Sequence, residues 1–214
     1  MAKTGKNTTD TRERLLQAAG EAFARSGFRS TTVREISKGA DANVAAVNYH
    51  FGDKEGLYAA VLQYASRAAM QKYPPDGGIG RQAPPEQRLA AFIRSFLHRI
   101  LDEGRPAWHG KLMAMETADP TPALDQILQE LVRPAFEILL SIIRDLLGNP
   151  EDNETVYFCA GSIVGQCLHY FYSRPVMERL VPMRLGAGVI DRLAEHIARF
   201  SLFAIKGIAQ ENGL

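Results

Sequence analysis

Cysteine and tryptophan are scarce in this chain, with two Cys and one Trp among 214 residues. Cys159 and Cys167 cannot build the disulfide framework of a small secreted domain, which favours a reducing compartment. No apolar run approaches the length of a membrane span, and residues 1–10 have no apolar stretch typical of a signal peptide. These absences predict a cytoplasmic protein with no membrane partner.

An excess of charge of one sign is also missing, because 25 Lys and Arg stand against 24 Asp and Glu. A basic coat over the whole protein is thereby excluded, although a local basic patch is not. Residues 1–60 hold nine basic and seven acidic side chains, and the remainder is slightly acidic. This small asymmetry has the sign expected if the N-terminal part contacts phosphate.

Strand signals are absent as well, since no segment alternates apolar and polar residues with a period of two. Apolar residues instead recur at helical spacing, which predicts an all-α fold. A first helix is expected to be capped by Asp10 and to end at Gly27, after a disordered terminus over residues 1–10. Later helices are expected at 86–103, 107–118, 122–147, 152–173 and 187–211, with Pro134 kinking one of them.

Proline and glycine gather in one place, the segment PPDGGIGRQAPP at 74–85. Four Pro and three Gly in twelve positions exclude both helix and strand, so this segment is a loop or a boundary. Short helical segments precede it and longer apolar ones follow. We expect an N-terminal helix-turn-helix domain over residues 1–62 and a helical ligand-binding and dimerisation domain over residues 63–214.

The segment 31–57, TTVREISKGADANVAAVNYHFGDKEGL, has the pattern of two short capped helices joined by a turn. Thr32 with Glu35 is a capping box, and Asn43 can cap the second helix. Apolar side chains at helical spacing are expected to pack the two helices together: Val33, Ile36, Ala40, Val44 and Val47. A helical hairpin that never contacts DNA would show the same spacing.

The outer face of this hairpin carries small and hydrogen-bonding side chains: Arg34, Ala45, Ala46, Asn48, Tyr49 and His50. Two Ala side chains would let a helix approach a surface closely, and their polar neighbours could then reach base edges, as a recognition helix requires. Lys54 begins the next expected helix, where its charge and the free N–H groups both favour phosphate.

This segment and its flanks, from Thr11 to Leu62, resemble the DNA-binding domain of the TetR family of transcriptional repressors. The segments LLQAAGEAFARSGFRSTTVREIS and VNYHFGDKEGLYAAVL carry the resemblance. It implies phosphate contacts at Thr32 and Lys54, a groove-facing Arg34, and a recognition helix over Asn43–His50. Asp41 replaces the family's usual turn Gly, and Asp tolerates left-handed backbone. Ala45 and Ala46 replace the more usual Gly-Thr and remove a hydroxyl.

The remainder of the chain is similar to the family's ligand-binding and dimerising domain. Residues 108–143, WHGKLMAMETADPTPALDQILQELVRPAFEILLSII, resemble the CecR-like subgroup. Polar groups among apolar helices are the usual composition of a ligand site, although core packing is the alternative for each aromatic and Met. The ligand candidates are Trp108, Met113, Glu116, Phe158, Gln166, His169, Tyr170 and Tyr172. Few Lys or Arg fall on the apolar faces of 86–173, so a neutral or cationic amphipathic effector is expected.

Two helices, 152–173 and 187–211, are apolar on more than one side. The first of them also has Gly161 and Gly165 four positions apart, which offers a flat strip for close helix contact. A fully internal helix would also explain this pattern, but the family resemblance favours a homodimer. Such a dimer would bind a near-palindromic double-stranded DNA operator and release it when a small-molecule effector binds. The alternatives are a small helical enzyme, with His98, His109 and Glu116 as its site, and an architectural DNA-binding dimer without ligand.

No catalytic residue, cofactor or metal is expected. Nucleophile elbow, P-loop and dinucleotide fingerprint are all missing from the sequence. The spacing of Cys159, Cys167 and His169 does not build a tetrahedral site by itself. A thiol switch is equally disfavoured, because a Cys in so apolar a helix is usually inert.

Overall fold

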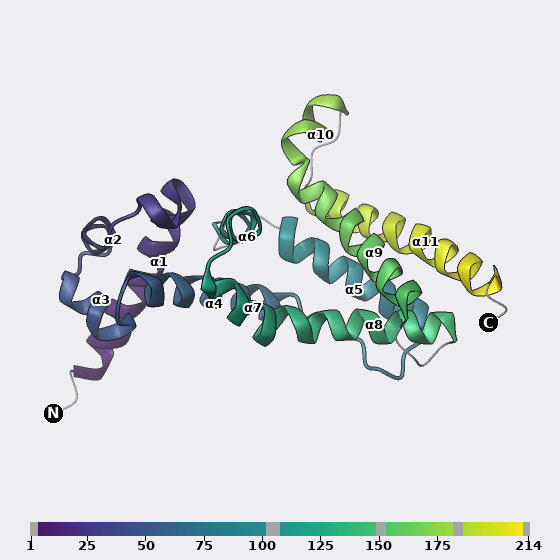
Figure 1. Ribbon diagram of the computed structural model, residues 1–214, viewed down its shortest axis with the longest axis horizontal. Coiled ribbons are helices and arrows are strands. Elements are labelled where there is room, and N and C mark those ends of the chain that lie inside the picture. Colours follow the sequence, from purple (N-terminus) through teal and green to yellow (C-terminus); the bar gives the residue numbers. More distant parts are fainter. Residues whose placement is uncertain (1–3, 102–107, 149–152, 182–185, 212–214) are drawn as a thin grey trace. The chain divides into compact units, whose positions relative to one another are not determined.

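The computed structural model describes residues 4–101, 108–148, 153–181 and 186–211, all of them in helices or the turns between helices. Within these ranges the chain contains no strand, which confirms the predicted all-α class (Figure 1). The described helices include none that is both long and apolar enough to span a bilayer.

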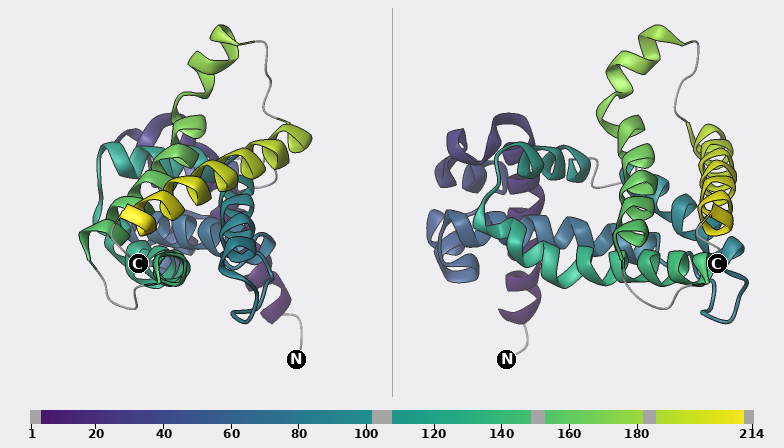
Figure 2. Two further views of the ribbon diagram at one scale, coloured as in Figure 1. Left: turned by 90° about the vertical axis from the view of Figure 1, so that its right-hand side faces the viewer. Right: turned by 45° about the vertical axis from the view of Figure 1, so that its right-hand side comes forward.

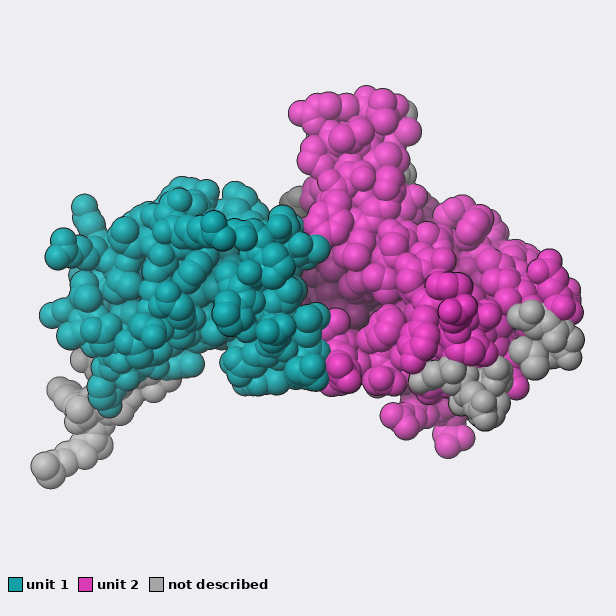
Figure 3. Space-filling view, in the orientation of Figure 1, with its two compact units in different colours: residues 1–68, 103–131 teal, residues 69–102, 132–214 magenta. Residues whose placement is uncertain are grey.

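The chain divides into two compact units, coloured separately in Figure 3. Unit 1 comprises residues 1–68 and 103–131, and unit 2 comprises residues 69–102 and 132–214. Sequence patterning predicts a single boundary near residue 62. The structure differs because the helices that follow residue 108 pack against the N-terminal helices.

Unit 1 begins with α1, Thr4–Ser30, so the first helix starts before the expected Asp10 cap and the tail expected to be disordered is helical from Thr4. Gly27 breaks this helix as predicted, since its φ of 78° is not helical. A positive φ is unfavourable for a residue with a side chain, which is why a glycine stands at the break. The other elements of the unit are α2 (Val33–Gly39), α3 (Val44–Phe51), the first part of α4 (Lys54–Lys72), α6 (His109–Ala118) and α7 (Pro122–Ile127).

Side-chain caps set the starts of the short helices, as the sequence predicts. Thr32 Oγ1 accepts from the Glu35 amide at 3.2 Å, and Asn43 Oδ1 accepts from the Ala45 amide at 3.0 Å. Asp53 Oδ1 accepts from the Gly56 amide at 2.7 Å at the start of α4. Asp41 adopts φ 48°, which confirms the left-handed turn expected there. The two helices of the hairpin are therefore fixed by local chemistry.

The core of unit 1 is formed by apolar side chains from α1, α2, α3, α4, α6 and α7. Trp108, just before α6, belongs to this core and is 9 % exposed. Its indole lies directly on Gly20 of α1, where a Cβ would come within 2.3 Å of the ring. Gly20 therefore makes room for the indole, and Trp108 fastens the start of α6 to α1.

Unit 2 is a helical bundle of α5 (Pro85–Leu101), α8 (Arg133–Leu147), α9 (Glu154–Tyr172), α10 (Arg174–Leu180) and α11 (Ala187–Glu211). Helix α5 contacts α8, α9 and α11, and α10 packs mainly against α9 (Figure 2). One apolar core runs through α5, α8, α9 and α11. The short α10 is not among the helices expected from the sequence.

The helix expected over 122–147 is divided into α7, a π-helical turn η1 (Leu128–Val132) and α8. Pro134 has no N–H to donate to the carbonyl of Glu130, so the regular hydrogen-bond pattern cannot continue past it. A π turn is a common way to absorb such an interruption. The irregularity predicted at Pro134 is thus present, as a widened turn immediately before it.

Candidate DNA interface and effector region

Helix α3 presents most of the side chains expected to read DNA. Asn43, Ala45, Asn48 and Tyr49 are exposed, Tyr49 with 79 % of its surface, and Ala46 and His50 are half-buried. Val47 alone on this helix is fully buried and holds α3 against the core of unit 1. The helix therefore combines one anchoring side chain with an outer face free to enter a groove.

Val44 does not pack between α2 and α3, where the sequence analysis places it, but is 38 % exposed. It is the first residue of α3, so its side chain extends beyond the helix start with no preceding turn to contact. Its spacing of three from buried Val47 suggests burial, and only the position at the helix end indicates otherwise. Val44 thus adds an apolar contact next to Ala45, suited to a thymine methyl group.

Cationic and hydroxyl groups flank α3. Thr32 and Arg34 are exposed at the start of α2, and Lys54 is half-buried at the start of α4. Lys54 Nζ donates to the Arg29 carbonyl oxygen at 3.2 Å and lies 4.6 Å above the Phe28 ring. An ammonium group has three donors, so two remain for a phosphate, and the contacts with α1 fix the position of the charge.

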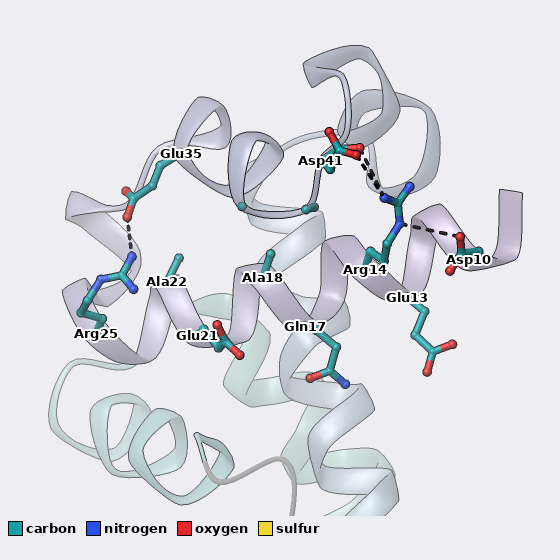
Figure 4. Close-up of a pocket in the computed structure, with 12 residues that line it drawn as sticks. Asp10, Glu13, Arg14, Gln17, Ala18, Glu21, Ala22, Arg25, Glu35 and Asp41 are labelled. Carbon is teal, nitrogen blue, oxygen red and sulfur yellow. Dashed lines mark hydrogen bonds and ion pairs between the residues drawn. The ribbon is translucent and has the colours of Figure 1, made fainter. Parts of the chain in front are cut away.

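A groove of about 580 Å³ lies between α1 and α2 on unit 1 (Figure 4). Five acidic side chains and two Arg line it: Asp10, Glu13, Glu21, Glu35, Asp41, Arg14 and Arg25. Arg25 pairs with Glu35 at 2.6 Å, and Arg14 lies 3.9 Å from Asp41 and 3.8 Å from Asp10. These ion pairs brace α2 and its turn against α1, and the acidic excess makes this face a poor surface for DNA phosphates.

The eight residues expected to bind effector are divided between the two units. Trp108, Met113 and Glu116 belong to unit 1, and the other five lie on α9 in unit 2. Trp108 is a core residue against Gly20, and half-buried Met113 packs on the same core. The expected ligand roles of these two are corrected to packing roles, because α1 already fills the space beside the indole.

Glu116 is also accounted for inside unit 1. Its carboxylate is 1 % exposed and accepts from Tyr58 Oη at 2.6 Å, from the Thr121 amide at 3.1 Å and from Thr121 Oγ1 at 3.0 Å. Burial raises the pKa of the Tyr58 hydroxyl, and the hydrogen bond to Glu116 raises it further. The expected effector contact is therefore corrected to an internal link between α6, α4 and the start of α7.

The α9 candidates do not share one site. Phe158 and Gln166 line a groove of about 440 Å³ between α9 and α11, and Gln166 Nε2 donates to Ser201 Oγ at 3.3 Å across it. His169 is exposed and lies 3.3 Å from Ser173 Oγ, Tyr172 is exposed, and half-buried Tyr170 packs on the core of unit 2. Five residues on α9 thus face three different surroundings.

Burial also shifts the pKa of one His and of both Cys thiols. Burial lowers the pKa of His109 to about 4, and its Nε2 lies 3.2 Å from Ser66 Oγ of α4. Burial raises the pKa of the Cys159 thiol and brings that of Cys167 to about 12. The described residues gather no group of three or more side chains that could hold a metal ion.

Helices α9 and α11 expose large aromatic side chains on unit 2, namely Phe158, Phe200 and Phe203. Gly161 and Gly165 are exposed on α9, and apart from the nearby backbone of α9 itself no described atom lies within 4 Å of where their Cβ atoms would stand. Helix α9 therefore has a flat strip bordered by aromatics, which single chains seldom leave in water.

Comparisons with known proteins agree with this geometry. Residues 15–61 match the family model described as bacterial regulatory proteins, tetR family. Residues 85–205 match that of the C-terminal domain of the HTH-type transcriptional dual regulator CecR. CecR of Shigella flexneri, an HTH-type transcriptional dual regulator, is 25% identical over 167 residues, which is 74% of each chain.

Two solved structures share the fold. The TetR family transcriptional regulator PfmR from Thermus thermophilus superposes with a TM-score of 0.64 at 17% identity, over 88% of this chain and 97% of its own. AibR, solved in complex with isovaleryl coenzyme A and operator DNA, also has a TM-score of 0.64 at 17% identity, over 88% of this chain and 96% of its own.

A capped helix-turn-helix in one unit and an all-helical second unit with an apolar outer strip define a DNA-binding transcriptional regulator. The chain belongs to the tetR family of bacterial regulatory proteins and carries the CecR-type C-terminal domain. The resemblance stated from the sequence is thereby confirmed for both parts of the chain.

Proposed function

We propose that the chain is a ligand-responsive repressor whose α3 lies in the major groove of an operator. The observation that carries this proposal is the exposed face of α3, with Ala45, Asn48 and Tyr49 outward and Val47 fully buried on the opposite side. Ala45 and Ala46 permit close approach, Val44 adds an apolar edge, and Asn48 has the paired donor and acceptor that suit adenine. Tyr49 and His50 extend the same surface.

Phosphate contacts complete the proposed interface. Thr32 and Arg34 lie at the start of α2, where free amide groups add a partial positive charge, and Lys54 supplies an ammonium at the start of α4. Lys54 is held by the Arg29 carbonyl and the Phe28 ring, so little side-chain freedom is lost when it meets a phosphate. These contacts would set the position of α3 without reading sequence.

A homodimer is proposed through the outer faces of α9 and α11. Phe158, Phe200 and Phe203 are too exposed for a soluble single chain of this size, and the Gly161–Gly165 strip allows two copies of α9 to approach closely. A twofold dimer pairs two copies of α3 with two half-sites, which makes a near-palindromic operator the expected target. Phe158 and Gln166 are assigned to this interface rather than to the effector.

The effector is proposed to bind within unit 2. Support comes from AibR, whose structure holds isovaleryl coenzyme A and operator DNA, and from the removal of Trp108, Met113 and Glu116 as candidates. The chain is proposed not to be an enzyme, in line with relatives named as transcriptional regulators. A regulator of bacterial operators acts in the cytoplasm, which is the proposed location.

Two substitutions test this function once fragments bound by the full chain have been selected from random DNA. Lys54→Ala should weaken binding to all sequences alike and reduce the slope of log affinity against log salt concentration by about one per subunit. Asn48→Ala should cost about 1–3 kcal/mol on the preferred operator and little on its variants, so that sequence discrimination falls.

Lys38→Ala is the matched control, since Lys38 is an exposed cation at the end of α2 with no assigned contact. Selection that enriches no sequence, or an Asn48→Ala protein that ranks operator variants as the wild type does, would contradict the assigned readout. An unchanged salt slope in Lys54→Ala would remove Lys54 from the interface.

A further inference from the structure

Two Arg side chains of α5 are largely withdrawn from water, and their surroundings differ. Arg88 is 8 % exposed, donates to Asp145 Oδ2 at 2.5 Å and has Ser141 Oγ at 3.4 Å. This is the ordinary arrangement of a buried cation, which is paired with a carboxylate. Arg99, three turns further along α5, has no carboxylate within ion-pairing distance in the described part of the chain.

The contacts of Arg99 use only one end of its guanidinium. Nη1 donates to the Tyr73 carbonyl oxygen at 2.8 Å and to Ser95 Oγ at 2.9 Å. The Phe96 ring centroid lies 5.5 Å from the guanidinium carbon. Nε and Nη2 make no hydrogen bond to the described residues. Neither atom is among the fully buried polar atoms that lack a partner, so both keep some accessible surface. Three N–H donors therefore remain available, two of them side by side on the edge formed by Nε and Nη2.

The Arg99 guanidinium is partly withdrawn from water in unit 2. Burial lowers the pKa of Arg99 to about 10, so the guanidinium keeps its charge at neutral pH although its hydration is reduced. The Cys167 thiol of α9 is near enough for the Arg99 charge to lower its pKa against the larger effect of burial. A cation in such a place attracts an anion more strongly than one in water.

We propose that Arg99 anchors the carboxylate of a small apolar effector, which it binds side-on through Nε and Nη2. This inference rests on the proposed effector-responsive function and names the class of effector. The two N–H groups of this edge match the two oxygens of a carboxylate. It revises the neutral or cationic ligand expected from the sequence, because the counter-charge that seemed to be missing is present at Arg99.

A single cation favours a carboxylate over a phosphate. His98, the neighbouring residue, is already engaged with Asp191 at 3.0 Å and stacks on Tyr73, so it adds no second free donor beside Arg99. A phosphate monoester carries close to two negative charges at neutral pH and would leave one of them uncompensated away from water. An apolar acid with one charge is neutralised completely.

The same guanidinium links this site to α4. Tyr73 is the first residue after α4, and its carbonyl is held by Arg99 Nη1, while Ser95 Oγ holds the Pro74 carbonyl. A carboxylate that turns the guanidinium toward itself competes with these bonds. The effector therefore has different affinities for the states in which Arg99 does and does not hold Tyr73, which any ligand-driven shift requires.

The test compares octanoate with octanamide, which has the same chain and no charge, by isothermal titration calorimetry on the full-length protein. Wild type should bind octanoate at least tenfold more tightly than octanamide, since a hydrogen bond to a charged group contributes about 1.5–3 kcal/mol. Octyl phosphate should bind more weakly than octanoate. Arg99→Gln should remove the preference for octanoate.

Arg94→Gln, on the exposed side of the same helix, is the matched control and should keep the preference. Arg99→Lys guards against a folding defect, because it keeps a donor for Tyr73 and loses only the paired edge; its octanoate affinity should fall about tenfold. Absence of octanoate binding to wild type, or equal binding to Arg99→Gln, would overturn the assignment.

Operator affinity separates this inference from the proposed function. Without octanoate, wild type and Arg94→Gln should bind operator alike, which shows that the DNA-binding function is intact whatever the octanoate result. With octanoate, wild type should lose operator affinity several-fold and Arg99→Lys should not. Octanoate bound at Arg99 with no change in operator affinity would overturn the effector role.

Discussion

At the scale of the residue, two polar side chains buried in unit 1, Glu116 and His109, each have a partner that explains them. Glu116 accepts three hydrogen bonds, from Tyr58 and Thr121, and His109 meets the Ser66 hydroxyl. Both residues belong to the enzyme site considered from the sequence, together with His98. His98 lies in unit 2 and is engaged by Asp191, so these residues are dispersed among separate structural roles.

His109 should make stability depend on pH. Its pKa is about 4 in the folded protein against an ordinary value near 6.5, so the unfolded chain binds a proton more readily between these values. The free energy of unfolding should therefore be fully maintained above pH 6.5 and fall as the pH drops toward 4, by about 1–3 kcal/mol from this residue.

Urea denaturation at a series of pH values measures this effect. His109→Gln should flatten the dependence between pH 6.5 and 4, whereas His169→Gln, which changes an exposed His, should leave it as in wild type. A pH dependence that is the same in all three proteins would show that His109 is not the group responsible.

At the scale of the element, α6 is tied to α4 by hydrogen bonds as well as by apolar packing. Tyr58→Phe should lower the free energy of unfolding by about 1–3 kcal/mol, because Glu116 loses its shortest hydrogen bond and remains buried. Tyr64→Phe is the control on the same helix, since the Tyr64 hydroxyl accepts a longer bond of 3.4 Å from Gln17.

A double-mutant cycle with Glu116→Gln gives the coupling between the two side chains, measured by urea denaturation. We expect a coupling free energy of about 0.5–3 kcal/mol in the stabilising direction. Additive effects of the two substitutions would mean that the bond contributes nothing beyond the packing of the ring against Phe23 and Phe28.

Signals from residues close together in the sequence predicted where the helices begin and end better than they predicted how the helices pack. Thr32 and Asn43 cap their helices as the sequence indicates, since a cap depends only on residues two or three positions away. Pro134 marked an irregular turn for the same reason. Trp108 could not be placed, because its burial depends on Gly20, 88 positions earlier, and a lone Gly carries no mark of the ring that covers it.

The free edge of Arg99 was equally hidden from sequence reasoning. Arg88 and Arg99 have the same side chain on the same helix, and only the position of Asp145 on α8 distinguishes a paired cation from an unpaired one. The exposed face of α3 was predicted because it follows from one short helix and its caps. Val44, expected in the core but exposed, lies at the helix end, where periodicity no longer applies.

At the scale of the whole molecule, the exposed aromatic side chains of α9 and α11 should determine whether the regulator dimerises and binds its operator tightly. Phe203→Asp places a charge on the proposed interface and should shift the protein to monomers, with loss of high-affinity operator binding. Leu180→Asp is the matched control, because Leu180 of α10 is 73 % exposed, as is Phe203, and lies outside the strip.

Sedimentation equilibrium measures the first effect, and operator titration of the same samples measures the second. Gly165→Leu should act in the same direction by separating the helices. A Phe203→Asp protein that sediments as the wild-type dimer would place the interface on another surface of unit 2.

The burial of both thiols has a practical consequence for watching this protein at work. Cys159 and Cys167 are the only sulfhydryls in the sequence, both are buried, and burial raises the pKa of each. Thiolate is the reactive form, so the native chain is nearly silent toward maleimide dyes and spin labels. A Cys placed at exposed Lys38 would then carry the single probe on each subunit, and the separation between two probes would report the spacing of the two reading heads.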